Sequence, residues 1–364
     1  MIRKTLNIYI SVRFLKVLAA MILGLGFLIV TVDFIDLLRR ASEVEDVGLW
    51  QLYSIALLRA PVFIERAFPF ACLFAAMITL TQLNSKMELV VVRAAGVSAW
   101  QFLLPIAFSA AIVGAFVTMV YNPLAIAATH KATDLLIEIL PRQNNGSYNL
   151  DKTHWIKQED DDGGSSIINA QLTRRSGQFL DGVKIIRFDA QGQIFERIDA
   201  DHAVHRGDYW LLVGGTKTAA SGKVTNFDTE NLKTRLTRDE LLGIGGKPEE
   251  VPFWDLIETA EKVEKSGTNG KPYLVQYHSL TALPMFLVAM TLIAATVCLR
   301  FVRFGQLGRM ILGGILTGFV LYTVTSLITA LGSNGVIPPV VAAWSPGFVA
   351  ILFGMSVLLH QEDG

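Results

Sequence analysis

Six long apolar segments, three on each side of one polar insert, constrain the fold of this chain more than any other feature. They cover residues 14–38, 58–83, 99–121, 279–301, 310–331 and 340–359. A run of about 20 apolar residues crosses a bilayer as a helix, in which every backbone polar group is satisfied internally. The hydrophobic content of 52% and the mean hydropathy of +0.44 agree with this reading. We therefore predict six transmembrane helices. The third span ends at Asn122 and Pro123, and residues 124–140 continue as a helix that leaves the membrane.

The distribution of basic residues predicts the orientation of these helices. Basic residues gather at the start of the first segment, after the second and around the end of the fourth: Arg3, Lys4, Arg13, Lys16, Lys86, Arg93, Arg300, Arg303 and Arg309. With six spans these positions fall on one side of the membrane, which the positive-inside rule identifies as the cytoplasm. The first segment is too long for a signal peptide and has no clear cleavage site, so we expect it to remain as a span.

The insert shows a different pattern, with short alternating runs from residue 149 onward. The runs cover residues 154–157, 166–173, 183–188, 194–203, 209–214 and 224–236. Gly, Asp and Asn turns separate them, which is typical of strands in an all-β sandwich or an open jelly roll. Alternating apolar residues such as Ile167, Ile185, Leu211 and Val213 form either a hydrophobic core or a track for acyl chains.

One amphipathic helix is predicted at residues 251–265, where the chain returns to the membrane. We expect three domains. They are the first three transmembrane helices at 1–122, a jelly-roll-like β domain with flanking helices at 123–272, and the last three transmembrane helices at 273–364.

The stretch at residues 84–100 mixes charged and apolar residues between the second and third apolar segments. Met87, Val90 and Val91 recur at helical spacing, and Gly96 ends the pattern. Two interpretations stay open on the residues alone. The stretch either docks a partner in the cytoplasm or lies as an interfacial helix on the bilayer.

Catalytic motifs are missing from the sequence. Three Gly-Lys pairs occur, but none has the upstream glycine and following Ser or Thr of a P-loop. We therefore expect no ATP site, no catalytic residue, no metal and no cofactor. His202 and His205 lie on one expected strand at a spacing that points them to opposite faces, and surface positions are favoured for both. The net charge of zero gives no reason to expect a nucleic-acid partner.

Several charged residues lie near the outer ends of the first two spans, where charge in a membrane is costly. They are Asp33, Asp36, Arg39, Arg40, Arg59, Glu65 and Arg66. Two interpretations are again open. The charges either neutralise one another, as Asp36 and Arg40 can at i, i+4, or form a site for an amphiphile with anionic headgroups.

In the fifth span, Gly314 and Gly318 form a small-xxx-small pattern that favours close helix packing.

The sequence resembles the lipopolysaccharide-export permeases, the LptF/LptG family. The similarity is strongest in AFPFACL at 67–73 and ELVVVRAAG at 88–96, which are similar to that family's second span and coupling helix. The ending GVIPP at 335–339, before the last span, is more similar to the LptG branch. The arrangement of six spans with a β domain after the third also matches, so the resemblance covers essentially the whole chain.

The resemblance implies a non-catalytic permease subunit of an ABC transporter in the bacterial inner membrane. In that family an LptF-like and an LptG-like permease pair over an LptB-like ATPase dimer. Lipopolysaccharide leaves the outer leaflet of the inner membrane and passes to LptC-like and LptA-like bridge proteins.

The resemblance also implies roles for particular residues. Those that would couple to the ATPase are Lys86, Glu88, Leu89, Val91 and Arg93. Those that would contact the lipid headgroup are Arg39, Arg40, Arg59 and Arg66, and Gly314 with Gly318 would serve packing or gating. Members of the LptG branch often carry a lysine in the outer half of the first span, where this chain has Asp33.

Two other functions would require features that the sequence lacks. A secondary lipid transporter needs an acidic residue near the bilayer midplane for its coupling ion, and the middles of these spans contain none. A membrane-embedded enzyme needs a nucleophile or metal cluster, and the sequence offers no motif for one. Extracting a lipid with several acyl chains costs about 0.8 kcal/mol per CH₂, so an ATPase partner is the simplest energy source.

Overall fold

The computed structural model describes residues 2–41, 48–88, 91, 98–139, 154–159, 164–172, 179–189, 191–234, 247–265, 269–300 and 307–363 of the chain. It forms two compact units. The first consists of Met1–Ile139, Pro252–Trp254 and Leu274–Gly364, and the second of Leu140–Val251 and Asp255–Tyr273.

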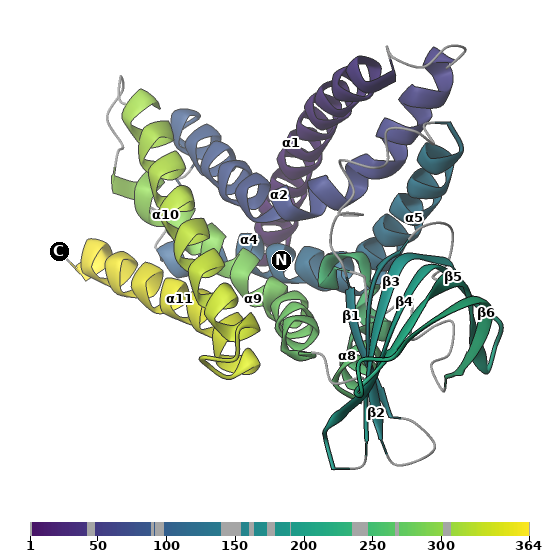
Figure 1. The fold of residues 1–364 in the computed structure, drawn as a ribbon. Helices are drawn as coiled ribbons and strands as arrows, with labels where there is room; N and C mark the ends of the chain where they lie inside the picture. The colour runs from purple at the N-terminus through teal and green to yellow at the C-terminus, as the bar shows by residue number, and fades with distance from the viewer. Residues whose placement is uncertain are drawn as a thin grey trace. The chain divides into compact units, whose positions relative to one another are not determined.

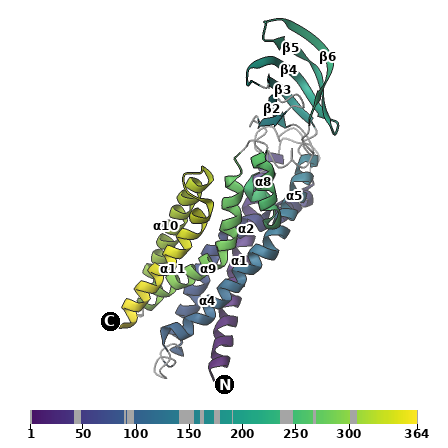
Figure 2. The same ribbon diagram turned by 90° about the horizontal axis from the view of Figure 1, so that it is seen from below.

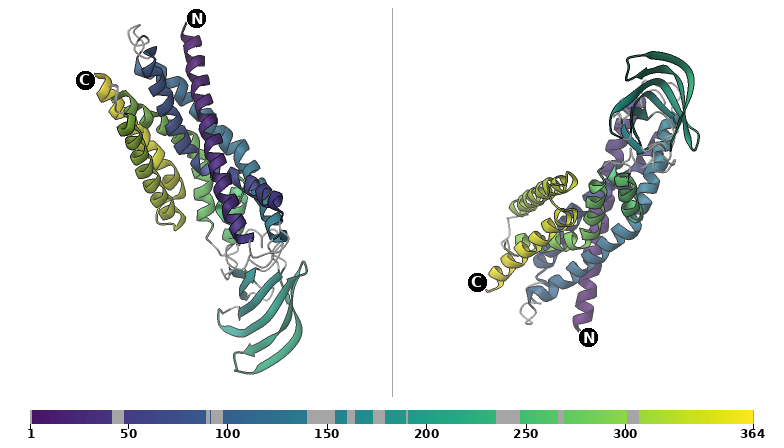
Figure 3. Two further views of the ribbon diagram at one scale, coloured as in Figure 1. Left: turned by 90° about the horizontal axis from the view of Figure 1, so that it is seen from above. Right: turned by 60° about the horizontal axis from the view of Figure 1, so that its bottom comes forward.

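Long helices build the first unit (Figure 1, Figure 2). These are α1 (Ile2–Ala41), α2 (Leu49–Ser85), α4 (Ala99–Phe116), α5 (Asn122–Ile139), α9 (Lys271–Arg300), α10 (Leu307–Ser333) and α11 (Pro339–Asp363). Six stretches are long and apolar enough to cross a membrane: Thr5–Ala41, Leu49–Ser85, Trp100–Leu136, Lys271–Cys298, Leu312–Ser333 and Pro339–His360. The prediction of six transmembrane helices is confirmed. Helices α10 and α11 lie side by side (Figure 3).

The second span begins earlier than the sequence pattern predicts. Helix α2 starts at Leu49 rather than at residue 58. Its first turns carry a buried apolar face, because Leu52 and Ile55 are at most 1% exposed. That face continues the periodicity of the span across a stretch that is more polar on its other side. Neither Pro61 nor Pro69 interrupts the helix.

The helix of the third span continues past Asn122 and Pro123, as the expected extension over residues 124–140 requires. Helix α4 passes through a π-helical turn, Val117–Tyr121, directly into α5. Proline lacks a backbone N–H, and its ring collides with the carbonyl four residues earlier, here that of Met119. In the wider turn the N–H of Asn122 donates to the carbonyl of Val117, five residues back. This widening relieves the collision, so the helix continues past the proline.

Small side chains allow close helix contacts in the core of the first unit. Ala75 and Ala76 of α2 are fully buried, as is Phe14 of α1. A Cβ added to Gly114 of α4 would stand 2.5 Å from the Cα of Pro284 in α9. Because no side chain fits at that distance, the crossing of α4 and α9 depends on glycine at this position.

The second unit contains an antiparallel sheet in which each strand pairs with the next along the chain (Figure 1). The strands are β1 (His154–Glu159), β2 (Ser165–Leu172), β3 (Phe179–Phe188), β4 (Ile194–His205), β5 (Tyr209–Ala219) and β6 (Val224–Lys233). The prediction of an inserted β domain is confirmed. Its described strands form one curved meander, and the two facing sheets of a sandwich are not formed among them.

One face of this sheet carries the hydrophobic core. Trp210 and Leu212 of β5 are at most 1% exposed, as is Ile168 of β2. In β5, Leu211 and Val213 alternate with Trp210 and Leu212 and are only half-buried, because successive residues of a strand point to opposite faces. His205 is buried against the ring of Trp210, so the favoured surface position is wrong for this histidine.

The helix predicted at residues 251–265 starts later than expected. It is preceded by two short 3₁₀ turns, and the elements are η2 (Pro248–Glu250), η3 (Phe253–Asp255) and α8 (Leu256–Lys265). A proline disfavours helical geometry in the residue before it. Accordingly Val251, which precedes Pro252, is extended, with φ −103° and ψ 128°.

A methyl group at position 114 tests the packing of α4 against α9. The variant G114A should lose roughly 1–3 kcal/mol of stability, because the added Cβ overpacks a close backbone contact. Thermal unfolding of the detergent-solubilised protein measures this loss. The control is G24A, since nothing lies within 4 Å of a Cβ added there. Equal effects of the two substitutions would contradict the packing described.

Candidate functional site

A sharp turn follows α2 and leads into the stretch for which docking to a partner is one of two predictions. Met87 adopts a left-handed conformation with φ 58°, which costs a residue other than glycine roughly 1 kcal/mol. Its N–H donates to the carbonyl of Asn84 at 3.0 Å, and the N–H of Val91 donates to the carbonyl of Met87 at 3.1 Å. The chain thus changes direction at Met87, and a new helical turn begins at Glu88.

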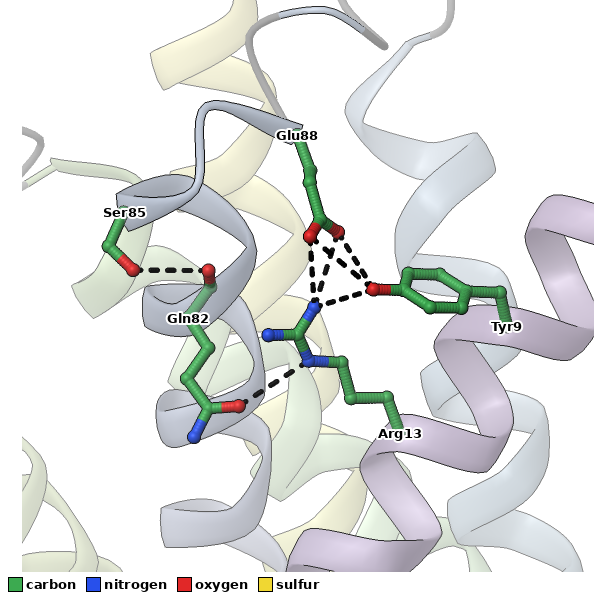
Figure 4. Close-up of polar contacts among 5 residues, drawn as sticks. All are labelled: Tyr9, Arg13, Gln82, Ser85 and Glu88. Carbon is green, nitrogen blue, oxygen red and sulfur yellow. Dashed lines mark hydrogen bonds and ion pairs between the residues drawn. The ribbon is translucent and has the colours of Figure 1, made fainter.

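The carboxylate of Glu88 points toward α1 and meets two of its side chains (Figure 4). The Tyr9 hydroxyl donates to Glu88 Oε2 at 3.1 Å, and the Arg13 guanidinium lies 3.2 Å from the same oxygen. Arg13 also donates to the Tyr9 oxygen at 2.9 Å. Three polar groups from two segments therefore form one closed set of hydrogen bonds, which we call the Glu88 cluster.

The Glu88 cluster also includes the end of α2. The Nε of Arg13 donates to the side-chain oxygen of Gln82 at 3.4 Å (Figure 4). The side chain of Arg13 is 14% exposed and that of Glu88 is 33% exposed. An ion pair at such a partly exposed position contributes at most about 1 kcal/mol to stability. Its main effect is to orient Glu88 and to join α1, α2 and the following segment.

Three further described residues of this stretch lie at exposed positions. Met87 is 55% exposed, Val91 is 67% exposed, and Lys86 is also exposed. Of the residues predicted for coupling, Leu89 and Arg93 lie outside the described part of the chain. The turn therefore presents two apolar side chains outward while Glu88 is held inward.

Ion pairs with aspartates of α1 hold Arg39, Arg40 and Arg59, which are predicted to contact a headgroup. Arg59 of α2 bonds to Asp33 of α1 at 3.1 Å, with side chains 17% and 14% exposed. Asp36 pairs with Arg40 at 2.7 Å and with Arg39 at 3.1 Å. Mutual neutralisation, one of the two interpretations of these charges, is therefore correct for Asp36 and Arg40.

The four arginines differ in their access to solvent. The side chain of Arg39 is 82% exposed, whereas that of Arg40 is 37% exposed. Arg66 lies at an exposed position on α2. An anion arriving from outside therefore meets Arg39 at a more exposed position than Arg59, and at either position it has to compete with an aspartate.

The two glycines of the fifth span both face α2. A Cβ on Gly314 would stand 2.5 Å from the Met77 sulfur, and one on Gly318 would stand 3.1 Å from the side chain of Leu73. The absence of side chains at these two positions lets α10 lie directly on α2.

Sequence reasoning missed the functional contacts of Tyr9 and Arg13. Arg13 served only as a marker of orientation, and Tyr9 carried no signal. Both lie more than 70 positions from Glu88 in sequence, so no local spacing connects them. The one available clue was that Tyr9 and Arg13 are four residues apart and thus share a helix face.

Together the fold and these contacts define a class of protein. It is a multi-pass membrane protein with an inserted β domain and a short turn that presents apolar side chains beside an anchored acidic residue. The chain belongs to the LptF/LptG family of lipopolysaccharide export system permeases, because the model of that family matches residues 8–360.

Similar proteins have the same extent as this chain. A lipopolysaccharide export system permease protein LptG from Haemophilus influenzae is 24% identical, over 99% of both chains. A protein of the same name from Escherichia coli K12 is 23% identical, over 91% of both chains. The similarity therefore includes the spans, the turn after α2 and the β domain alike.

The pair between Arg59 and Asp33 makes a prediction about stability. The variant R59Q should lose about 1–3 kcal/mol, because it leaves a largely buried carboxylate without its ionic partner. R39Q is the matched control, since the guanidinium of Arg39 is mostly in solvent. Thermal unfolding in detergent compares the two. A loss in R39Q as large as that in R59Q would contradict the assignment.

Proposed function

We propose that this chain is the LptG-type permease of an ABC transporter that extracts lipopolysaccharide from the inner membrane. It pairs with an LptF-like permease over an LptB-like ATPase dimer and delivers the lipid to LptC-like and LptA-like bridge proteins. Membership of the family and the full-length similarity to proteins named LptG support this proposal. The proposed domains are 1–122, 123–272 and 273–364, with the middle domain in the periplasm.

The exposed apolar side chains of the turn after α2 are the observation that best supports a role in coupling to an ATPase. Extraction of acyl chains needs energy, and the sequence has no P-loop that would bind ATP. Met87 and Val91 present exposed apolar surface on the side that the positive-inside rule makes cytoplasmic. An ATPase that covers this surface gains apolar burial. Of the two alternatives for this stretch, docking therefore accounts for the exposed apolar side chains and for the anchoring of Glu88.

The Glu88 cluster gives docking a mechanical consequence. Glu88 bonds to Tyr9 and Arg13 of α1, so displacement of the turn pulls on α1 as well as on α2. Helix α1 carries an outward apolar face that includes Leu23 and Phe27, which are 74% and 77% exposed. Movement of this helix changes the space available to acyl chains beside it.

The charged outer ends of α1 and α2 supply the proposed headgroup site. Arg39 is more exposed than Arg40 and Arg59, and a phosphate that binds any of these three exchanges with its carboxylate partner. Phosphate accepts bidentate hydrogen bonds from arginine, as the carboxylates do. Gly314 and Gly318 keep α10 against α2, and we assign the opening of this contact as the gate.

The proposal predicts that the outward apolar surface binds the ATPase. The double variant M87D/V91D should lose copurification of the LptB-like ATPase, because it places charge in an apolar contact. A pull-down from detergent-solubilised membranes, followed by ATPase assay, measures this loss. V224D is the matched control, because Val224 lies in β6 and is 60% exposed.

Two results would contradict the proposal. The first is an ATPase that copurifies equally with M87D/V91D and with wild type. The second is a wild-type complex, reconstituted with its partners, that hydrolyses ATP without releasing lipopolysaccharide from vesicles.

A further inference from the structure

Asn122 is a buried polar residue that directly follows the π turn. It is 2% exposed, and its side chain makes two hydrogen bonds. Its Nδ2 donates to Glu65 Oε1 of α2 at 2.9 Å, and its Oδ1 accepts the backbone N–H of Phe253 at 2.9 Å. The two partners fix the orientation of the amide, because an ionised carboxylate can only accept and a backbone N–H can only donate.

The proline that follows Asn122 creates a second contact with the same segment. Pro123 has no N–H, so the carbonyl of Met119 receives no helical hydrogen bond from it. The indole Nε1 of Trp254 donates to this carbonyl at 3.2 Å. Phe253 and Trp254 therefore each bond to the turn at Asn122, one through its backbone and one through its side chain.

Phe253 is also held by α9. Its ring is 5% exposed and stacks on Tyr277, with centroids 5.2 Å apart and planes at 7°. The π turn is fixed to α9 and to α2 by further bonds. The Thr118 hydroxyl donates to the carbonyl of Leu280 at 2.7 Å, and the Tyr121 hydroxyl donates to that of Pro61 at 3.1 Å.

The segment held in this way has a particular place in the chain. Pro252–Trp254 belongs to the helical unit, while the residues before and after it, up to Val251 and from Asp255, belong to the unit that contains the sheet. Helix α2, which bonds to Asn122 through Glu65, ends at the turn around Met87, which we call the coupling turn. Glu65 and Ser85 are separated by about 30 Å along the helix, at 1.5 Å per residue.

We propose that Asn122 is a positioning residue of the transport cycle. It joins α2 and the π turn to Pro252–Trp254, so that a displacement begun at the coupling turn reaches the chain segment that flanks the β domain. This inference rests on the proposed function, because it takes ATP-driven movement of the turn as its input. Apolar side chains at this position would pack in a membrane without any buried polar group that needs a partner. The hydrogen bonds of Asn122 instead allow only one alignment of α2, the π turn and Pro252–Trp254.

A reversal of the hydrogen bond tests the proposal. In N122D the new carboxylate accepts from Phe253 but faces the carboxylate of Glu65, so the contact to α2 is lost. In N122D/E65Q the amide of residue 65 donates to the carboxylate of residue 122, and both bonds are restored in reversed polarity. The single variant E65Q should behave as wild type, because its amide oxygen still accepts from Asn122.

The measurement is the amount of lipopolysaccharide transferred to an LptA-like acceptor per ATP hydrolysed by the purified complex. We expect N122D to assemble and hydrolyse ATP but to transfer roughly fivefold less lipid per ATP, and N122D/E65Q to recover. A merely structural role would lower the yield of complex and leave this ratio unchanged. An unchanged ratio in N122D would overturn the proposal.

If the N122D protein fails to assemble with its partners, W254F is the second variant with which to test the proposal. It removes only the indole donor of a side chain that is 63% exposed, and W50F at a 76% exposed position is its control. A lower transfer ratio in W254F alone supports the proposal, and equal ratios overturn it. Failure of the wild-type complex to transfer lipid would instead overturn the proposed function, so the two failures are distinguishable.

Discussion

Polar groups inside a bilayer have to find partners within the protein, and this constraint shapes the helical unit. Helix α2 carries three such groups at different levels: Gln82, Glu65 and Arg59. Each bonds to another segment, namely Arg13 of α1, Asn122 at the π turn and Asp33 of α1. Because these bonds are directional and join different segments, they fix the position of α2 relative to its neighbours.

The glycines of α10 and the polar pairs of α2 act in opposite ways. Gly314 and Gly318 bring α10 against α2 without any directional bond, so that contact can open at low cost. The bonds of Arg13 and Asn122 are directional and resist displacement. A helix that is hydrogen-bonded to some neighbours and meets another across two glycines is suited to moving with the first and parting from the second. This arrangement is the physical basis of the transport cycle proposed for the chain.

The spans could be predicted from sequence because apolar length alone decides them. The stretch after α2 could be marked as amphipathic for a similar reason, since helical spacing is local, but the residues alone left docking and an interfacial helix equally open. The partners of Glu88 could not be predicted, because contacts across more than 70 residues leave no local pattern. The helix on both sides of Asn122 and Pro123 could be predicted from its composition, but the π turn that joins the two parts could not, because its wider geometry leaves no local sequence pattern. In β5, Leu211 and Leu212 are equally apolar, so the pattern could not show which one is buried.

The central claim is that the Glu88 cluster transmits movement of the coupling turn to α1. The most direct test is the amount of lipopolysaccharide released per ATP hydrolysed by the reconstituted complex that carries R13Q. The account predicts ATP hydrolysis near the wild-type rate and about tenfold less lipid release, which corresponds to a loss of about 1.4 kcal/mol of coupling. K16Q, at an exposed position of the same helix, should equal wild type. Release per ATP in R13Q equal to that in K16Q would contradict the claim.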